Sequence, residues 1–358
     1  RLQYFQQLLS NSKETLITYK AENNGEEIPA SPWVEALENF HLLCFEKSLA
    51  NRELTGLLLM HSSVMICDTE ALPERTQQAA PKAHGNLLPK RISAGSHQRL
   101  INCPYQFFAG DMLKLKPADE ISEELKKSDY GERVHKALQA FHQQVDMLPP
   151  PFNEAVNTGN REQAIEHLIN TSSVIFANDL EDNILHRGWL HRWLKHIPSY
   201  IDWQIKQQQN WSIYSTEENI EKETEASTII FGRLDRVDQN YIENNGEHCI
   251  IDYKTGSSAK QGDVDCGENI QLTTYALLDE AASNIIYLIL DDSKNKIKQG
   301  ATLSGEALGS IKQDVLYRLK IMLDMIKNEN KLPAWGDTTT CSYCHFEGLC
   351  RKVPGKAE

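Results

Sequence analysis

The sequence contains no long hydrophobic run, because its densest apolar stretch, Ile285–Leu290, is far shorter than the roughly 20 residues that a membrane-spanning helix needs. No G-x4-G-K-S/T segment occurs either, so we expect no ATP hydrolysis by this chain. Eight cysteines among 358 residues are too few for a disulfide scaffold. These absences favour a soluble, cytoplasmic protein with reduced thiols and no membrane partner.

Acidic residues outnumber basic residues by 50 to 37, which gives a formal net charge of −13. This charge argues against a surface coated with phosphate-binding cations, although a local basic groove is compatible with an acidic total. The length exceeds what one hydrophobic core usually fills. Residues 68–93 contain three prolines and one glycine among polar side chains, the composition of a long loop or linker, so we place a domain boundary near Ile92. A start at Arg1, without Met or a signal peptide, is typical of a fragment.

Beyond this boundary, the periodicity predicts alternating helices and strands. Apolar residues at spacings of 4, 3 and 4 between Val134 and Val145 predict an amphipathic helix over residues 131–145. Residues 228–238 and 249–254 read as two strands of a hairpin, joined by a turn at Asn244-Asn245-Gly246. Further helices are predicted near residues 161–180, 183–209, 270–278 and 305–328, with a strand over 285–290. This alternation predicts an α/β fold.

Two acids and a lysine fall on the predicted hairpin. Asp252 and Lys254 are two residues apart, so their side chains project from one face of the strand. Asp235, on the other strand, would lie beside Asp252 at a strand spacing of about 5 Å. Two carboxylates this close repel each other, and a divalent cation such as Mg²⁺ relieves that repulsion by binding both. Such a cation activates water and polarises a phosphodiester, with Lys254 able to orient the water; a surface ion pair is the alternative.

Two further pairs of residues extend this constellation. His135 follows Gly131 at the start of the amphipathic helix, where a neutral imidazole could complete a metal shell. Gln271 and Tyr275 are four residues apart, so they share one helix face and could contact a phosphate or the lysine. Each pair taken alone is also compatible with an ordinary surface or half-buried position.

In this order, the motifs resemble the RecB/AddB-type branch of the PD-(D/E)XK nuclease superfamily over about residues 94–358. The resemblance rests on Gly131-x3-His135, Gly232-Arg-Leu-Asp235-Arg-Val-Asp238, Asp252-Tyr-Lys254-Thr255-Gly256 and Gln271-x3-Tyr275. It implies a restriction-endonuclease-like mixed β-sheet flanked by helices, with extensive helical decoration. It also implies Mg²⁺ or Mn²⁺ held by His135, Asp235, Asp252 and the carbonyl of Tyr253, with Lys254 as the catalytic lysine and Gln271 and Tyr275 in support.

Four of the cysteines are spaced like metal ligands. Cys341, Cys344 and Cys350 form C-x2-C-x5-C, and Cys103 lies far upstream. Tetrahedral thiolate coordination suits Zn²⁺, and the same ligands suit an iron–sulfur cluster. The spacing resembles the AddB-type pattern, which implies a 4Fe-4S cluster. Closing so long a loop would remove roughly 5 kcal/mol of chain entropy from the unfolded state, so we expect the cluster to act as an iron–sulfur staple.

Three charged features remain open to two readings each. The helix predicted over residues 183–209 interleaves cations with tryptophans, which fits either a single-strand channel or a core helix with a basic solvent side. Residues 217–225 contain five glutamates and are interpreted as a solvated face or loop. Arg233 and Arg236 flank Asp235, and each is expected either to contact DNA or to pair with Asp238.

The resemblance implies a metal-dependent deoxyribonuclease that acts in DNA repair or recombination, by analogy an exonuclease on single-stranded ends. Residues 1–93 would be the tail of a helicase-like region plus a linker, and residues 94–358 the nuclease domain with its cluster. Expected partners are DNA and a helicase subunit or a helicase-like portion of the same protein. The alternatives are a non-catalytic DNA-binding scaffold for a partner helicase and a zinc-stapled endonuclease; intact Asp235, Asp252 and Lys254 argue against the scaffold.

Overall fold

The structure is a computed structural model of the chain and divides into two compact units, Arg1–Thr76 and Gln77–Glu358. Each unit is described by itself. The residues described are 2–19, 22–23, 26–61, 78–117, 127–182, 184–224, 228–242, 246–256, 258–291 and 296–352.

The first unit consists of short elements and has no fully buried side chain among its described residues. Apolar side chains such as Phe40 and Leu43 are 59% and 85% exposed. The described part of this unit therefore builds no hydrophobic core of its own. Its elements are α1 (Leu2–Asn11), β1 (Glu22–Asn23), β2 (Glu26–Glu27), α2 (Pro32–Phe45) and α3 (Arg52–His61).

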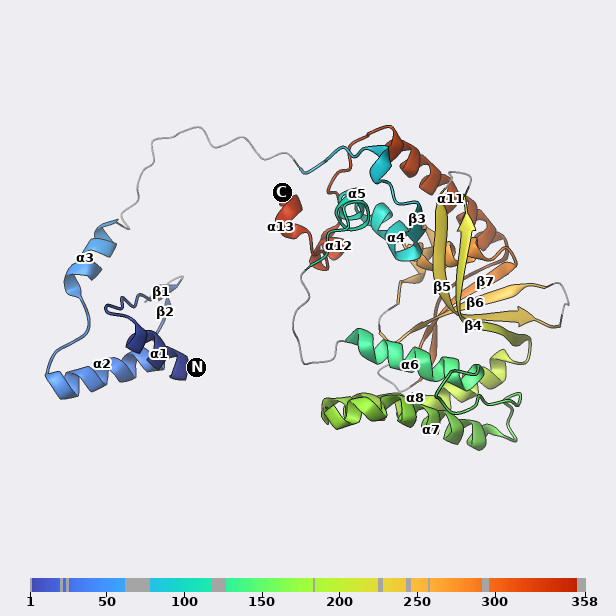
Figure 1. The fold of residues 1–358 in the computed structure, drawn as a ribbon, viewed down its shortest axis with the longest axis horizontal. Coiled ribbons are helices and arrows are strands. Elements are labelled where there is room, and N and C mark those ends of the chain that lie inside the picture. The colour runs from blue at the N-terminus through green and yellow to red at the C-terminus, as the bar shows by residue number, and fades with distance from the viewer. Residues whose placement is uncertain are drawn as a thin grey trace. The chain divides into compact units, whose positions relative to one another are not determined.

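A six-stranded mixed sheet forms the centre of the second unit (Figure 1). Its strand order is β3-β5-β6-β7-β8, with β4 paired along β5. The β3–β5 and β6–β7 pairs are parallel, and the other pairs are antiparallel. The strands are β3 (Arg91–Ser93), β4 (Trp211–Glu223), β5 (Ile229–Asn240), β6 (His248–Lys254), β7 (Ala282–Ile289) and β8 (Lys298–Ser304).

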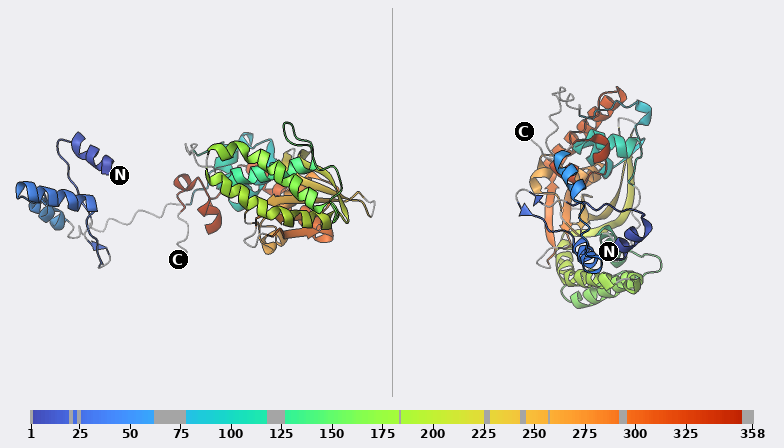
Figure 2. Two further views of the ribbon diagram at one scale, coloured as in Figure 1. Left: turned by 90° about the horizontal axis from the view of Figure 1, so that it is seen from below. Right: turned by 90° about the vertical axis from the view of Figure 1, so that its left-hand side faces the viewer.

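Helices cover both faces of this sheet. Figure 2 shows α6 (Lys127–His142), α7 (Arg161–Asp182) and α8 (Ile184–Gln207) lying together over one face. The remaining elements are η1 (Gly85–Leu87), α4 (Ala94–Asn102), α5 (Pro104–Phe107), the π-helix η2 (Phe108–Met112), α9 (Gln261–Asp265), α10 (Gln271–Leu278), α11 (Gly305–Lys327), α12 (Thr338–Ser342) and α13 (Glu347–Cys350). Among the described residues, no helix has the length and apolarity that crossing a membrane requires.

The sheet separates two hydrophobic cores because successive strand residues point to opposite faces. Ile250 packs with α4, α10 and α11, whereas Ile251 packs with α6, α7 and α8. The apolar residues of α6 recur at the expected helical spacing and are fully buried in the second core, which explains why this sequence forms a helix on that face. The catalytic candidates on β6 thus belong to a strand buried on both sides.

Strands β3 and β6 share one edge of β5 and leave a gap between them. β3 pairs with β5 as far as Phe231, and β6 begins to pair at Arg236. β4 pairs along nearly the whole length of β5, so it must occupy the opposite edge. The segment 232–235 therefore has a paired strand on one edge only. We call this opening the β5 notch.

The two ends of the second unit run side by side. Leu332 N donates to Pro81 O at 2.8 Å, and Ala334 N donates to Ala79 O at 2.8 Å. Lys82 and Lys331 form an antiparallel bridge beside these bonds. Residues 79–82 and 331–334 are thus joined by backbone hydrogen bonds.

The predicted α/β fold with a mixed, helix-flanked sheet is confirmed. The helices and strands predicted beyond residue 93 are present as α6, α7, α8, α10, α11, β5, β6 and β7. The reading of residues 217–225 as a solvated face or loop is confirmed in part: residues up to Glu223 form β4 against β5 and not a loop, Glu218, Glu221 and Glu223 are exposed on that strand, and Glu217 is largely buried. The turn residues Asn244 and Asn245 lie outside the described residues. The first unit ends at Thr76, upstream of the boundary placed near Ile92.

A buried histidine makes the stability of this fold depend on pH. His97 of α4 is fully buried, with Nδ1 3.1 Å from Thr274 Oγ1. Burial, with a smaller effect of the Arg318 charge, lowers the pKa of His97 to about 3. Between about pH 6.5 and pH 3, His97 binds a proton in the unfolded chain but stays neutral in the folded chain. The free energy of unfolding therefore falls as the pH decreases toward 3.

We predict that His97→Gln, which keeps a donor for Thr274, reduces this loss by up to ~1.4 kcal/mol per pH unit. Urea unfolding at about pH 7.5 and about pH 4.5, on either side of the ordinary histidine pKa, measures the difference. His191→Gln, at an exposed histidine of α8, is the matched control. Equal pH dependence in the wild type and both variants would contradict the prediction.

Candidate metal centre and active site

Three potential metal ligands converge at the β5 notch. His135 of α6 has Nδ1 3.4 Å from Asp235 Oδ1 of β5 and 3.7 Å from Glu217 Oε1 of β4. One ligating atom from each of the three residues lies within 4.8 Å of the others. An imidazole and two carboxylates in this arrangement are suited to a divalent cation.

Asp252 and Tyr253 approach the same place from β6. Tyr253 is paired with Leu288 of β7, and on the β5 side its N donates to the side chain of Asp235, at 2.8 Å from Oδ2. Asp252 is buried, and Lys254 Nζ lies 2.7 Å from its Oδ2 in an ion pair. Burial, and then the charge of Asp235, raises the pKa of Asp252. The sheet thus places two acids next to each other where its hydrogen bonding is interrupted.

His135 responds to the acids around it. Burial alone would lower the pKa of His135, but the side chains and charges of Asp235 and Glu217 raise it to about 10. In the absence of a metal ion, the protonated imidazole therefore compensates part of the negative charge. A metal ion on this imidazole has to displace that proton.

Glu217 was not anticipated from the sequence. Its backbone is left-handed, with φ of 51°, just after a register shift between Ile213 and Ser215 in β4. This conformation is costly for a non-glycine residue and is retained where the surrounding structure imposes it. Its side chain is only 6% exposed, and Oε2 accepts from Arg233 Nε at 2.6 Å. Residues 217–225 contain five glutamates, and the sequence pattern does not distinguish Glu217 from the other four.

Lys254 is held by a second set of contacts on the α10 side. Its Nζ donates to Gln271 Oε1 at 3.4 Å, and Gln271 Nε2 donates to Tyr275 OH at 3.2 Å. The ammonium also lies 5.2 Å from the centre of the Tyr287 ring. Tyr287 was not anticipated either, because its alternation on β7 reads only as a core strand. The predicted group of Lys254, Gln271 and Tyr275 is therefore one connected chain of contacts.

Two glycines of the recognised motifs allow close approach. A Cβ on Gly232 would lie 2.9 Å from Cε1 of Tyr275, so only glycine lets this ring pack over β5. A Cβ on Gly131 would lie 3.1 Å from Thr255 Oγ1, directly after Lys254. Both glycines thus bring elements of the site together.

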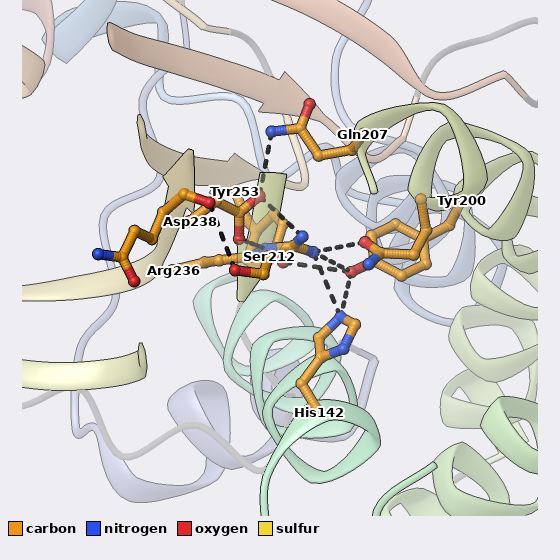
Figure 3. Close-up of polar contacts among 9 residues, drawn as sticks. His142, Tyr200, Gln207, Ser212, Arg236, Asp238 and Tyr253 are labelled. Atoms are coloured by element: carbon orange, nitrogen blue, oxygen red, sulfur yellow. Dashed lines mark hydrogen bonds and ion pairs between the residues drawn. The ribbon is translucent and has the colours of Figure 1, made fainter. Parts of the chain in front are cut away.

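A buried polar network lies on the other face of β5 (Figure 3). The guanidinium of Arg236 is fully buried and binds Asp238 through two hydrogen bonds of 2.6 and 2.9 Å. Nη1 of Arg236 donates to Gln204 Oε1 at 2.6 Å and to Tyr200 OH at 3.2 Å. Of the two arginines that flank Asp235, Arg236 pairs with Asp238, whereas Arg233 pairs with Glu217.

The same network connects the helices to the metal strands. Tyr200 OH lies 2.6 Å from His142 Nε2 and 3.2 Å from Tyr253 OH. Burial, and then the charge of Arg236, lowers the pKa of His142. His142 and His135 are seven residues, about two turns, apart on α6. The ring of Tyr253 also contacts His135 edge-on at 5.7 Å. The network therefore fixes the helix that carries His135.

The four predicted thiol ligands line one cavity. Cys103, Cys341, Cys344 and Cys350 surround it together with Tyr105, Ala334 and Gly336. A single Zn²⁺ with bonds of about 2.3 Å requires sulfur atoms about 3.8 Å apart. Among the described residues, no three of these sulfurs come within 4.8 Å of one another. The described structure therefore brings the four thiols to one cavity but does not gather them as ligands of one ion, and it shows neither the expected iron–sulfur cluster nor its zinc alternative.

The profile of the PD-(D/E)XK nuclease superfamily matches residues 91–351, which is most of the chain. The chain therefore belongs to the PD-(D/E)XK nuclease superfamily.

Individual relatives are distant. An uncharacterised protein of Rickettsia felis is 26% identical over 199 residues, covering 55% of this chain and 22% of the relative. An uncharacterised protein of Rickettsia bellii is 23% identical, and the match covers 77% of this chain and 31% of the relative. A protein of Alkaliphilus oremlandii that is named as a subunit of an ATP-dependent helicase/deoxyribonuclease is 25% identical, covering 68% and 23%. The chain thus spans between a fifth and a third of the length of these relatives.

Among solved structures, the protein SSO0001 shares 19% identity at a TM-score of 0.27, covering 66% of this chain and 99% of that chain. A likeness at this score supports no argument about fold or function.

The buried Arg236–Asp238 pair yields a stability prediction. Asp238→Ala leaves the guanidinium uncompensated in the core, so we expect the free energy of unfolding to fall by about 3–5 kcal/mol. The matched control is Asp202→Ala, which removes the carboxylate of an exposed pair with Arg161 at 2.6 Å. That change should cost no more than ~1 kcal/mol. Chemical denaturation measures both variants, and comparable losses would contradict the assignment.

Proposed function

We propose that this chain hydrolyses phosphodiester bonds of DNA with the help of Mg²⁺ or Mn²⁺, as the nuclease module of a longer protein of DNA repair or recombination. The carrying observation is the convergence of His135, Glu217 and Asp235 within 4.8 Å, beside the Asp252–Lys254 ion pair. Membership of the nuclease superfamily supports the reaction class.

The donor set fits a hard divalent cation. Asp235 and Glu217 offer oxygens and His135 a nitrogen, and Asp252 and the carbonyl of Tyr253 join them by the family resemblance. The side chains are half-buried or buried, so their repulsion is poorly screened without a cation. When bound, a divalent ion lowers the pKa of water and polarises the phosphoryl oxygen.

Lys254 is positioned to act beside the phosphate. Its contacts with Asp252 and Gln271 hold the ammonium at a fixed place, and Tyr275 holds Gln271. The acids nearby favour the charged ammonium, so we assign Lys254 to orienting the attacking water and stabilising negative charge. Gln271 and Tyr275 act through Lys254, and the exposed Arg233 holds Glu217.

The setting in a longer protein is part of the proposal. A relative that this chain resembles is named a helicase/deoxyribonuclease subunit. The first unit leaves apolar side chains of α2 exposed, which fits a segment completed by further polypeptide. We therefore assign residues 1–93 to the junction with a helicase-like portion and residues 94–358 to the nuclease. Its proposed substrate is the end of a single DNA strand, and its proposed location is the cytoplasm.

We further propose that the cysteine cavity holds a 4Fe-4S cluster that staples Cys103 to the C-terminal segment. The support is that four thiols line one cavity and that their spacing along the sequence resembles the AddB-type pattern. All four are free of disulfides. The cluster would close a loop that contains strands β4 to β8 of the sheet.

The reaction is tested with 5′-labelled single-stranded DNA and Mg²⁺ or Mn²⁺. We expect Asp252→Asn and Lys254→Ala to reduce hydrolysis by at least about 100-fold, because each removes an interaction made with the transition state. Glu217→Gln should instead raise the Mn²⁺ concentration needed for half-maximal activity, with partial recovery at high Mn²⁺.

The control is Asp202→Asn, an exposed acid of α8 away from the notch. Thermal unfolding of each variant shows whether the fold persists. Equal DNA hydrolysis by the wild type, Asp252→Asn and Lys254→Ala would refute the mechanism.

The cluster is tested on anaerobically purified protein. We expect iron and acid-labile sulfide, and broad visible absorption that a reductant bleaches. Cys103→Ser should lose this absorption and lower the unfolding temperature, whereas Cys266→Ser, at an exposed cysteine outside the cavity, should change neither. A colourless protein that contains zinc would exclude the proposal.

A further inference from the structure

The first half of α8 is basic, although the protein as a whole is acidic. Its sequence from residue 184 to residue 201 contains no acidic residue, in a protein of net charge −13. Arg187, His191 and Lys195 are exposed and four residues apart, so they form one row along the helix. Neither Arg187 nor Lys195 forms an ion pair with any described residue. We call these three residues the α8 row.

The tryptophans of this helix do not share the exposed side. Trp193 is fully buried, and its Nε1 donates to Ser172 Oγ at 2.9 Å. Trp189 packs against Tyr130 of α6 at 5.8 Å. Trp203 lies under the guanidinium of Arg236 at 5.3 Å. These aromatic residues thus belong to the core, and the described solvent side of α8 offers cations without a stacking platform.

A short chain of contacts connects α8 to the active site. Arg192, on the turn between His191 and Lys195, pairs with Asp291 at 2.7 Å. Asp291 follows Leu290, whose N donates to Lys254 O at 2.8 Å. The helix that carries the α8 row is therefore connected, through Arg192 and Asp291, to the segment after β7 that pairs with Lys254 at the end of β6.

We propose that the α8 row binds the phosphate backbone of a single DNA strand whose end lies in the active site. This inference rests on the proposed function and adds the path of the substrate. Residues four apart rise about 6 Å along a helix, so Arg187 and Lys195 place two positive charges about 12 Å apart, with the polar imidazole of His191 between them, along the path of an extended polyanion. Because no described tryptophan or tyrosine of α8 is exposed, we expect binding that depends on charge and not on base sequence.

The proposal is tested by fluorescence anisotropy of labelled oligo(dT) and oligo(dA), measured with EDTA so that no strand is cut. Each lost phosphate contact lowers the slope of log affinity against log salt by about 0.7 for single strands. Arg187→Ala combined with Lys195→Ala should therefore lower the slope by about 1.4 and weaken both oligonucleotides alike.

The control combines Lys320→Ala with Lys331→Ala, which removes the same charge from exposed positions outside α8. We expect its slope to remain within about 0.3 of the wild type, less than half the effect of one lost contact. Equal slopes for the α8 variant and the wild type, or equal losses in both double variants, would overturn the inference. Since binding is measured without cleavage, this result is independent of whether the chain hydrolyses DNA.

Discussion

Repulsion among carboxylates in the β5 notch is the constraint on which the rest of the site depends. Three acids from three different strands meet there, and water cannot screen them fully. Basic side chains of the protein offset this negative charge. Lys254 pairs with Asp252 and Arg233 pairs with Glu217. His135 lies between Glu217 and Asp235. This balance keeps the acids together in the absence of a metal ion and defines where a divalent ion is most strongly favoured.

The sheet and helices serve to hold this balance in place. Because β3 and β6 stop short of each other on β5, Asp235 can accept a backbone hydrogen bond from Tyr253. The buried network around Arg236 then ties α6 and α8 to the opposite face of the same strand. A buried network whose charges are paired restricts its members to one arrangement, and here it fixes the helix that presents His135.

Alternation and spacing predicted β5, β6 and the shared strand face of Asp252 and Lys254, whereas the roles of the motif residues were implied by the resemblance to the family. Alternation and spacing could not predict Glu217, whose role follows from a register shift and a left-handed backbone that no local pattern encodes. The partners of Arg233 and Arg236 were open for a similar reason, since only the tertiary surroundings of β5 decide which arginine meets Asp238. The tryptophans of α8 were open to two interpretations, because their helical spacing is compatible with a hydrophobic core and with a DNA channel. In the structure they pack in the core.

The backbone pairing between residues 79–82 and 331–334 determines how the nuclease unit would respond to mechanical load. This antiparallel junction lies next to the cysteine cavity, which Ala334 lines. Because the two segments are antiparallel, a force that separates residue 79 from residue 334 would break their hydrogen bonds one after another. Tension applied to these two segments would therefore load this junction and the cysteine cavity beside it before it loaded the strands that carry the carboxylates.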